Sequence, residues 1–292
     1  MVNVSGRVGV NGSEEHGAGS VLCLDTATDW CSVALLDTGT TGIEVKSESA
    51  LEAGRSHARL LLPMIDRVLG AADIGPDGVA AIVVGCGPGT FTGVRMGVAT
   101  GRAIALGLGV PIAGVSTLGA LAAAATGLGS VGAQGVETLA VCVDARRGEL
   151  FVAAYRRWRR AHTSDQTHPV SPAPVSPETS VMWHKVGESF ACSPSALARE
   201  VRRRVPGSEE WAVVCPERSL EDIVESGGFA KVTAADPRAK NLLLGQERLV
   251  ETEGATGGTY PEWGDPEHVR PIYIRPPDAD IHIKKMRDPW QS

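Results

Sequence analysis

The sequence predicts a two-part α/β protein. Three observations indicate this class: short apolar runs alternate with helical patterns, each half opens with two strands joined by a polar turn, and the composition suits a packed core. The 292 residues include 43% hydrophobic side chains and carry a net charge of −6. Intrinsic disorder of the whole chain is therefore excluded, and the length allows one large domain or two small ones.

Residues 1–19 are rich in Gly, Ser, Asn and Glu, and we expect them to be a disordered tail. The sequence pattern of the rest of the first half predicts one sheet with helices. The run AAIVVG is continuously apolar, as in a strand covered on both faces. Pro63 should kink its helix or mark the first turn. The predicted elements are strands at 21–27, 31–37, 80–85 and 110–115 and helices at 57–69, 94–108 and 117–125.

The second half begins near Gly127 and opens with another strand pair, TLAVCVDAR and ELFVAAYR. A helix is predicted at 195–204, and RPIYIR at 270–275 is a late strand or an extended tail. Residues 159–180 are rich in Pro, Ser, Thr and His, which is typical of a loop or insertion. We therefore expect an N-terminal lobe at 20–126 and a smaller C-terminal lobe at 127–292.

Composition also limits the environment and the partners. The longest uncharged stretch, 103–136, is interrupted by Gly, Pro, Ser and Thr, so we expect no membrane span. The six cysteines form no C-x-x-C pair and are interpreted as small buried thiols. No secretion signal is recognisable, so a cytoplasmic protein with reduced thiols is expected. Because the net charge is negative, we do not expect the protein to bind nucleic acid through its overall charge.

The run GCGPGTFTGVR at 85–95 is the first candidate site. Its glycines, Gly87 and Gly89 among them, could let backbone N–H groups converge on a phosphate at a helix N-terminus. Alternatively, they simply turn a strand sharply into a helix. The run matches neither a Walker loop nor G-x-G-x-x-G. Both interpretations stay open.

Small residues recur every four positions in the helix that follows: Gly93, Gly97, Gly101 and Ala105. They lie on nearly one face. Glycine inside a helix costs roughly 1 kcal/mol relative to alanine, so something must approach this face closely. That neighbour is either the protein's own sheet or a helix of another subunit, and both alternatives stay open.

Carboxylates end the first strand of each half, at Asp25-Thr26 and at Asp144. In an α/β fold such positions lie near the ligand crevice and could organise Mg²⁺ and a nucleotide phosphate. Each aspartate could instead accept hydrogen bonds from its own turn. The sequence contains neither H-E-x-x-H nor G-x-S-x-G, and no histidine pair has the helical i, i+4 spacing, so these hydrolase classes and a histidine metal site are not expected. Arginines at 156–160 and 199–204 form a solvated face or an RNA contact.

Together these segments resemble the bacterial TsaB (YeaZ) family. The resemblance rests on VLCLDTATDWCSVALLD, HARLLLPMIDRVL, GCGPGTFTGVRMGVATGRAIALGLGVPIAGVSTL and VDARRGELFVAAY. It spans residues 20–156 in continuous order, and G-P-G-T-F-T-G-V-R followed by G-V-S-T-L is its most specific part. Residues 157–265 resemble the family weakly.

The resemblance implies an actin-like ATPase (ribonuclease H-like) fold with two related lobes. It also implies an accessory role in forming N6-threonylcarbamoyladenosine beside the anticodon of tRNAs that read codons beginning with A. The catalyst would be the paralogue TsaD, joined by the ATPase TsaE. TsaD has a metal-binding H-x-x-x-H after a strand ending in Gly-Val, whereas here Thr117 and Leu121 stand at those positions. The alternative function is an autonomous nucleotide hydrolase or phosphotransferase.

The resemblance further implies pairing with TsaD through first-lobe helices, and a homodimer when TsaD is absent. It implies no cofactor in isolation and, at most, ATP or ADP with Mg²⁺ in the complex, where tRNA is met indirectly. Asp25, Thr26, Gly87, Gly89 and Asp144 would be a remnant of a nucleotide site. Replacing Gly101 with leucine is expected to abolish pairing and spare the fold. The expected interface residues are His57, Leu61, Ile65, Val68, Gly93, Arg95, Gly97, Gly101, Arg102 and Ala105.

Overall fold

The computed structural model describes most of both predicted halves. The described ranges are 19–39, 42–127, 136–159, 181–207, 211–216, 231–235, 237–244, 246, 249–250 and 263–275. Residues 1–18 of the predicted tail and 160–180 of the predicted insertion lie outside them.

The first sheet is formed by the first five strands of the chain. In chain order they are β1 (Ser20–Asp25), β2 (Trp30–Gly39), β3 (Gly42–Glu52), β4 (Val79–Gly85) and β5 (Ile112–Val115). Their spatial order is β3-β2-β1-β4-β5. The first three strands pair antiparallel, and β4 and β5 continue the sheet parallel to β1.

The second sheet repeats this plan. Its strands are β6 (Thr138–Arg146), β7 (Glu149–Arg159), β8 (Val181–Lys185), β10 (Trp211–Cys215) and β11 (Lys231–Ala234), in the order β11-β10-β6-β7-β8. Here too the leading strands pair antiparallel, whereas β10 and β11 are parallel to β6. Two short additions, β12 (Leu249–Val250) beside β8 and β9 (Phe190–Cys192) beside β7, complete it. The prediction of two related lobes is confirmed.

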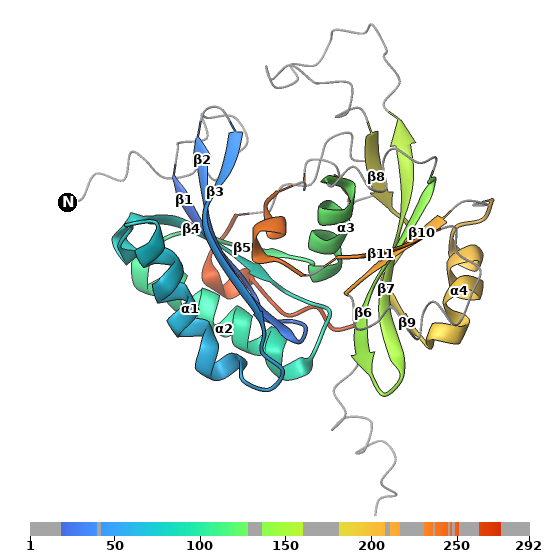
Figure 1. The fold of residues 1–292 in the computed structure, drawn as a ribbon, viewed down its shortest axis with the longest axis horizontal. Helices are drawn as coiled ribbons and strands as arrows, with labels where there is room; N and C mark the ends of the chain where they lie inside the picture. Colours follow the sequence, from blue (N-terminus) through green and yellow to red (C-terminus); the bar gives the residue numbers. More distant parts are fainter. Residues whose placement is uncertain are drawn as a thin grey trace, which may run out of the picture.

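Helices and sheets form successive layers (Figure 1). α1 (His57–Ala71) and α2 (Phe91–Leu108) cover one face of the first sheet. Its other face packs on Ala120 of α3 (Thr117–Gly127) and on the 3₁₀ turn η5 (Ala239–Leu242). The opposite side of α3 packs on the second sheet, whose outer face carries α4 (Leu197–Arg204).

Burial explains why the central strands are continuously apolar. Leu22 and Leu24 of β1 point into the core beneath α1 and α2, and Val21 and Cys23 point into the core beneath α3. All four side chains are 0% exposed. A strand sandwiched in this way has no polar face, as expected for the middle of an α/β sheet.

Several elements differ from the sequence expectations. β3, 11 residues long, is an edge strand that the sequence analysis left as a polar segment. α1 continues through Pro63 to Ala71. Residues 270–275 form no strand, and the chain bends at Ile274 and Arg275.

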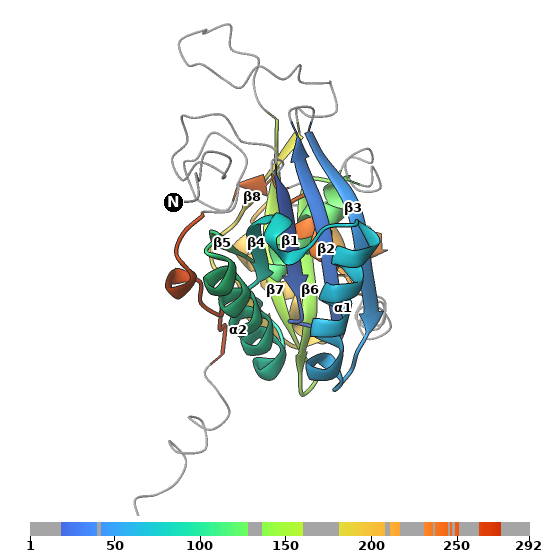
Figure 2. The same ribbon diagram turned by 90° about the vertical axis from the view of Figure 1, so that its left-hand side faces the viewer.

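Those residues belong to a segment, 263–275, that we call the closing strap. Gly264 exchanges two backbone hydrogen bonds with Ile112 at the edge of β5, with N···O distances of 3.0 and 3.1 Å. Ile272 N donates to Cys86 O at 2.8 Å. Arg275 reaches the second lobe, where its guanidinium donates to Ala145 O at 2.6 Å and pairs with Glu149. Figure 2 shows the strap running beside α2, and these contacts join it to both lobes.

Candidate partner surface and lobe cleft

The glycine face of α2 packs on the protein's own sheet. A Cβ at Gly93 would lie 2.1 Å from the carbonyl oxygen of Thr26, and one at Gly97 would lie 2.5 Å from Thr26 Oγ1. At Gly101 a Cβ would meet Ile112 and Val84 at 3.4 Å. Of the two alternatives for these glycines, packing on the protein's own sheet is therefore correct. Their close neighbours are Thr26, which directly follows β1, and side chains of β4 and β5.

This packing corrects most of the expected interface residues. The apolar stripe of α1 faces its own sheet, so its side chains are unavailable to a partner. The buried positions are His57 (6% exposed), Leu61 (2%), Ile65 (7%), Val68 (1%) and Ala105 (1%), together with Gly93, Gly97 and Gly101. Because a Cβ at Gly101 already touches Ile112 and Val84, the further atoms of a leucine would have to displace core side chains, and we now expect Gly101→Leu to destabilise the fold. Arg95 is exposed and Arg102 is half-buried.

The outward surface of the first lobe carries a different set of apolar side chains, which we call the apolar face. Within the described ranges, the exposed large hydrophobic residues are all on α1, α2 or the closing strap: Leu62 (60%), Phe91 (40%), Leu106 (75%), Ile272 (40%) and Tyr273 (43%). Arg95 organises one end of it, with its guanidinium carbon 3.7 Å from the centre of the Phe91 ring. Its Nε donates to Tyr273 Oη at 2.8 Å.

The glycine loop before α2 is a tightly packed turn. Thr90 caps the helix by accepting from Gly93 N at 3.3 Å, and its own N–H donates to Ala27 O at 2.7 Å. A Cβ at Gly89 would lie 2.0 Å from Ala27 O. Gly87 has φ +87°, which favours glycine. These contacts support the interpretation of the loop as a sharp strand-to-helix turn.

Asp25 is sealed inside the first lobe. Its side chain accepts from Ala27 N at 2.8 Å and from Thr117 Oγ1 at 3.0 Å. Burial raises the pKa of this carboxyl to about 6, although these hydrogen bonds and the nearby His57 oppose the shift. Thr26 is also buried and donates its hydroxyl to Gly93 O at 2.7 Å. Neither side chain can reach a ligand without rearrangement.

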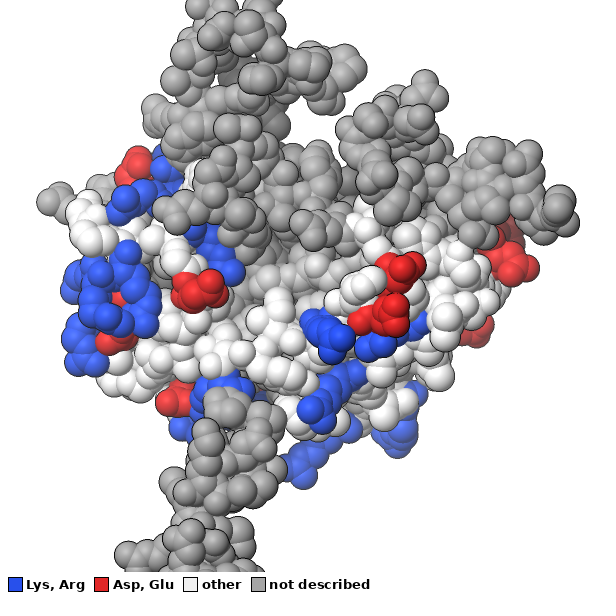
Figure 3. All heavy atoms as spheres, turned by 180° about the vertical axis from the view of Figure 1, so that it is seen from behind, with Lys and Arg blue, Asp and Glu red and all other residues white. Residues whose placement is uncertain are grey.

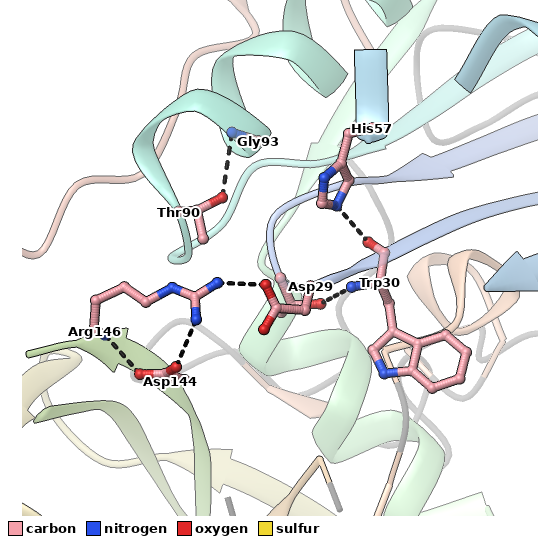
Figure 4. Close-up of polar contacts among 8 residues, drawn as sticks. Asp29, Trp30, His57, Thr90, Gly93, Asp144 and Arg146 are labelled. Carbon is pink, nitrogen blue, oxygen red and sulfur yellow. Dashed lines mark hydrogen bonds and ion pairs between the residues drawn. The ribbon is translucent and has the colours of Figure 1, made fainter. Parts of the chain in front are cut away.

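Asp144 occupies the matching position in the second lobe. Asp25 is the last residue of β1 and Asp144 lies two residues before the end of β6. Each accepts from the backbone N–H two residues on, Ala27 N at 2.8 Å and Arg146 N at 2.6 Å. Asp144 differs in being exposed, and it pairs with the Arg146 side chain at 3.1 Å. The same guanidinium pairs with Asp29, in the β1–β2 turn of the first lobe (Figure 4). The two strand ends therefore face each other across the lobes.

The described residues do not fit a magnesium–nucleotide group as they stand. Asp25 has both oxygens engaged internally, and Asp29 and Asp144 are paired with Arg146. Within the described ranges, His, Cys, Asp and Glu form no group of three that could hold a metal ion. Ser226-Gly227-Gly228, a weak match to the nucleotide motif of the catalytic paralogue, lies outside those ranges.

All six cysteines are buried and free, as expected from the sequence. Burial raises the pKa of Cys31 and Cys192 to about 11 and of Cys86 and Cys215 to about 12. A thiol that stays protonated at neutral pH is a poor nucleophile, so these groups offer no covalent chemistry.

The arginines of α4 gather into a basic patch on the surface, seen at the left of Figure 3. Glu200 lies among its arginines and binds Arg203 at 3.0 Å and also Arg204. Hydrogen bonds from Arg204 and Arg203 lower the pKa of Glu200 to about 2. The solvated-face and RNA-contact interpretations of this helix both stay open.

The repeated strand order of the two sheets defines a two-lobed α/β protein. The family of tRNA N6-adenosine threonylcarbamoyltransferases, TsaD, matches residues 50–231. The tRNA threonylcarbamoyladenosine biosynthesis protein TsaB of Escherichia coli is 32% identical over 179 residues, which cover 60% of this chain and 73% of that protein. TsaB of Haemophilus influenzae is 38% identical over 132 residues, 45% of this chain and 52% of that protein.

The solved structure of YeaZ from Pseudomonas aeruginosa gives a TM-score of 0.59 at 25% identity, over 87% of this chain and 99% of that one. The chain belongs to the TsaB (YeaZ) family, which confirms the resemblance seen in the sequence. Among the described residues, no helix is long and apolar enough to cross a membrane.

Proposed function

We propose that this protein is a non-catalytic subunit in the biosynthesis of tRNA threonylcarbamoyladenosine, and that it binds the catalytic paralogue TsaD through its apolar face. Its relatives from Escherichia coli and Haemophilus influenzae are named as tRNA threonylcarbamoyladenosine biosynthesis proteins, and this supports the pathway. The apolar face supplies the docking surface, which the complex with TsaD and TsaE would cover. When TsaD is absent, a second copy of this chain would cover the same surface in a homodimer, because one face can pair with itself about a two-fold axis.

The observation that carries this proposal is the distribution of exposed apolar side chains. Leu62 and Leu106 are 60% and 75% exposed, on the two helices that cover the first sheet. Within the described ranges, the large exposed apolar side chains come from α1, α2 and the closing strap alone, and exposed apolar groups confined to one part of a protein mark interaction sites more often than scattered ones. Phe91 and Tyr273, held by Arg95, add aromatic and guanidinium groups of the kind that dominate interface energies.

The non-catalytic role is supported by the residues at the two positions where the resemblance places the metal-binding histidines of TsaD. Thr117, in a position where the resemblance places a metal-binding histidine of TsaD, donates its hydroxyl to Asp25. Leu121, in the second such position, is 0% exposed. Neither side chain is a suitable metal ligand. We therefore expect tRNA to meet this subunit only through the complex, in the cytoplasm.

The test is binding of cognate TsaD to variants of the apolar face. Leu62→Asp and Leu106→Asp each place a charge at an exposed position, so the fold should be preserved. We expect each to weaken binding at least tenfold, since a truncated interface anchor costs about 1–2 kcal/mol or more. Isothermal titration calorimetry with purified TsaD measures the change.

Ser195→Asp is the matched control, because it adds the same charge at an exposed position of the second lobe. It should bind TsaD like the wild type. Wild-type affinity in both leucine variants would contradict the docking surface. Saturable turnover of MgATP by the isolated chain, lost on Asp25→Ala, would instead support an autonomous nucleotide hydrolase.

A further inference from the structure

The outward face of α4 is formed by arginine side chains. Arg199, Arg202 and Arg203 are exposed and have the i, i+3, i+4 spacing that places side chains on the same face of a helix. Leu197 and Val201 lie on the opposite face, where they are 0% exposed and pack in the outer core of the second lobe. The apolar anchor therefore turns the arginines toward solvent, as Figure 3 shows.

α4 keeps an excess of positive charge after its own ion pairs are counted. Glu200 binds Arg203 at 3.0 Å, Arg199 at 3.6 Å and also Arg204. It is the one carboxylate of the helix, so four arginines against one glutamate leave three positive charges in excess. The paired side chains of Arg199 and Arg203 remain 77% and 65% exposed. Ion pairs this exposed contribute little, so a phosphate can replace Glu200 as their partner.

Contacts on both sides hold these arginines in place. The guanidinium carbon of Arg204 lies 3.7 Å from the centre of the Phe190 ring in β9, and the same side chain donates to Glu200 O at 3.2 Å. Arg156 of β7, which is also exposed, donates to Pro206 O at 2.8 Å, just beyond the end of α4. The two basic runs of the sequence therefore meet here. We call the exposed members the arginine patch: Arg156, Arg199, Arg202 and Arg203.

We propose that the arginine patch binds the phosphate backbone of the tRNA within the complex with TsaD, an inference that rests on the proposed function. A guanidinium matches phosphate oxygens with two parallel hydrogen bonds, which makes arginine well suited to this contact. The whole chain carries a net charge of −6. Most of its surface therefore repels RNA, and the arginine patch is a local exception that attracts it.

The surroundings of the arginine patch favour RNA over an acidic protein. Protein interfaces have an apolar centre inside a polar rim. Within the described ranges, none of the large exposed apolar side chains lies on α4 or on the second sheet. The arginine patch thus offers charge without an apolar centre, and contacts of this kind position a nucleic acid without reading its sequence.

The test compares two double variants of the full chain in complex with TsaD. Arg199→Gln with Arg203→Gln removes two charges from the arginine patch. Lys46→Gln with Lys240→Gln is the matched control, because it removes two charges from ion-paired lysines of β3 and η5 in the first lobe. Fluorescence anisotropy with labelled, unmodified tRNA measures binding from about 50 to about 300 mM KCl.

The arginine variant should bind tRNA at least tenfold more weakly at about 100 mM KCl. Its plot of log affinity against log salt concentration should become shallower by about 2, because each phosphate contact contributes a slope close to one. The lysine variant should match the wild type in both respects. Both variants should bind TsaD like the wild type in calorimetry, since neither changes the apolar face.

Wild-type tRNA affinity and salt dependence in the arginine variant, with TsaD binding intact, would overturn this inference and leave the proposed function standing. Equal losses in both double variants would indicate overall charge alone and would also overturn it. So would weaker binding of TsaD or TsaE with unchanged tRNA affinity, which would make the arginine patch a protein-docking surface. Failure of the wild type to bind TsaD would instead refute the proposed function, and this inference with it.

Discussion

Replacing the sealed carboxyl of Asp25 by an amide should change how stability depends on pH. Asp25→Asn keeps the shape of the side chain. Its amide oxygen can still accept from Ala27 N, and its N–H₂ can donate to the Thr117 hydroxyl, which now accepts. What disappears is the ionisable group, whose pKa burial raises from 3.8 to about 6 in the folded protein.

The sign follows from proton binding. Between pH 4 and 6 the folded state holds the Asp25 proton more tightly than the unfolded state does, so this group makes the wild type less stable as pH rises. Above pH 6 the loss is complete. A shift of about two pKa units corresponds to about 3 kcal/mol. Asp25→Asn should therefore gain up to about 3 kcal/mol on the wild type between pH 4 and pH 8.

Urea unfolding followed by tryptophan fluorescence at pH 4, 5, 6, 7 and 8 measures that difference. Asp66→Asn, at an exposed position of α1, is the control and should stay level with the wild type at each pH. If the free-energy difference between Asp25→Asn and the wild type did not change from pH 4 to pH 8, the carboxyl would not be sealed as described, and the reasoning would fail.

Three further predictions concern packing and access. Gly93→Ala should lower the free energy of unfolding by about 1–3 kcal/mol, because its Cβ meets the Thr26 carbonyl oxygen at 2.1 Å. Gly107→Ala, in the same helix with nothing within 4 Å, should instead stabilise by up to about 1 kcal/mol; urea titrations that gave both the same sign would refute this contrast. Arg275→Ala removes the strap's contacts with Ala145 and Glu149, and limited proteolysis should cut the chain near residue 270 several times faster than in the wild type. Because the six cysteines are buried, Ellman's reagent should titrate them only after unfolding, and prompt reaction of native protein would contradict their placement.

The central strands and the two-lobe plan could be predicted from the sequence because their signal is local. A run such as AAIVVG has no polar face, so it must be covered on both sides. β3 also carries a local signal, since Ile43, Val45 and Leu51 alternate with charged residues. Ser47 and Ser49 interrupt the apolar series, which is why the segment was interpreted as polar.

The direction in which each helix faces was the main error. The apolar stripe of α1 was assigned to a partner, but it packs on the first sheet of the same chain. The useful signal was that α1 has more apolar residues than one helix face can bury. Leu60, Leu61 and Leu62 are consecutive, and three neighbouring helix positions cannot all face inward, so one of them had to be exposed. The pairing of Arg146 with Asp29 has no local signal, because two turns from different lobes must be placed before their charges meet.

The closing strap has a consequence for protein synthesis. Val269 completes the core beneath α1 and α2, and Gly264 covers the edge of β5, yet the ribosome makes both after every described strand of either sheet. The first lobe therefore leaves the ribosome before the second, but it gains its last core residue and its edge cover only after the strands of the second lobe have been made. A nascent chain halted at residue 260 would expose the β5 edge, the kind of unpaired edge that invites pairing with other chains.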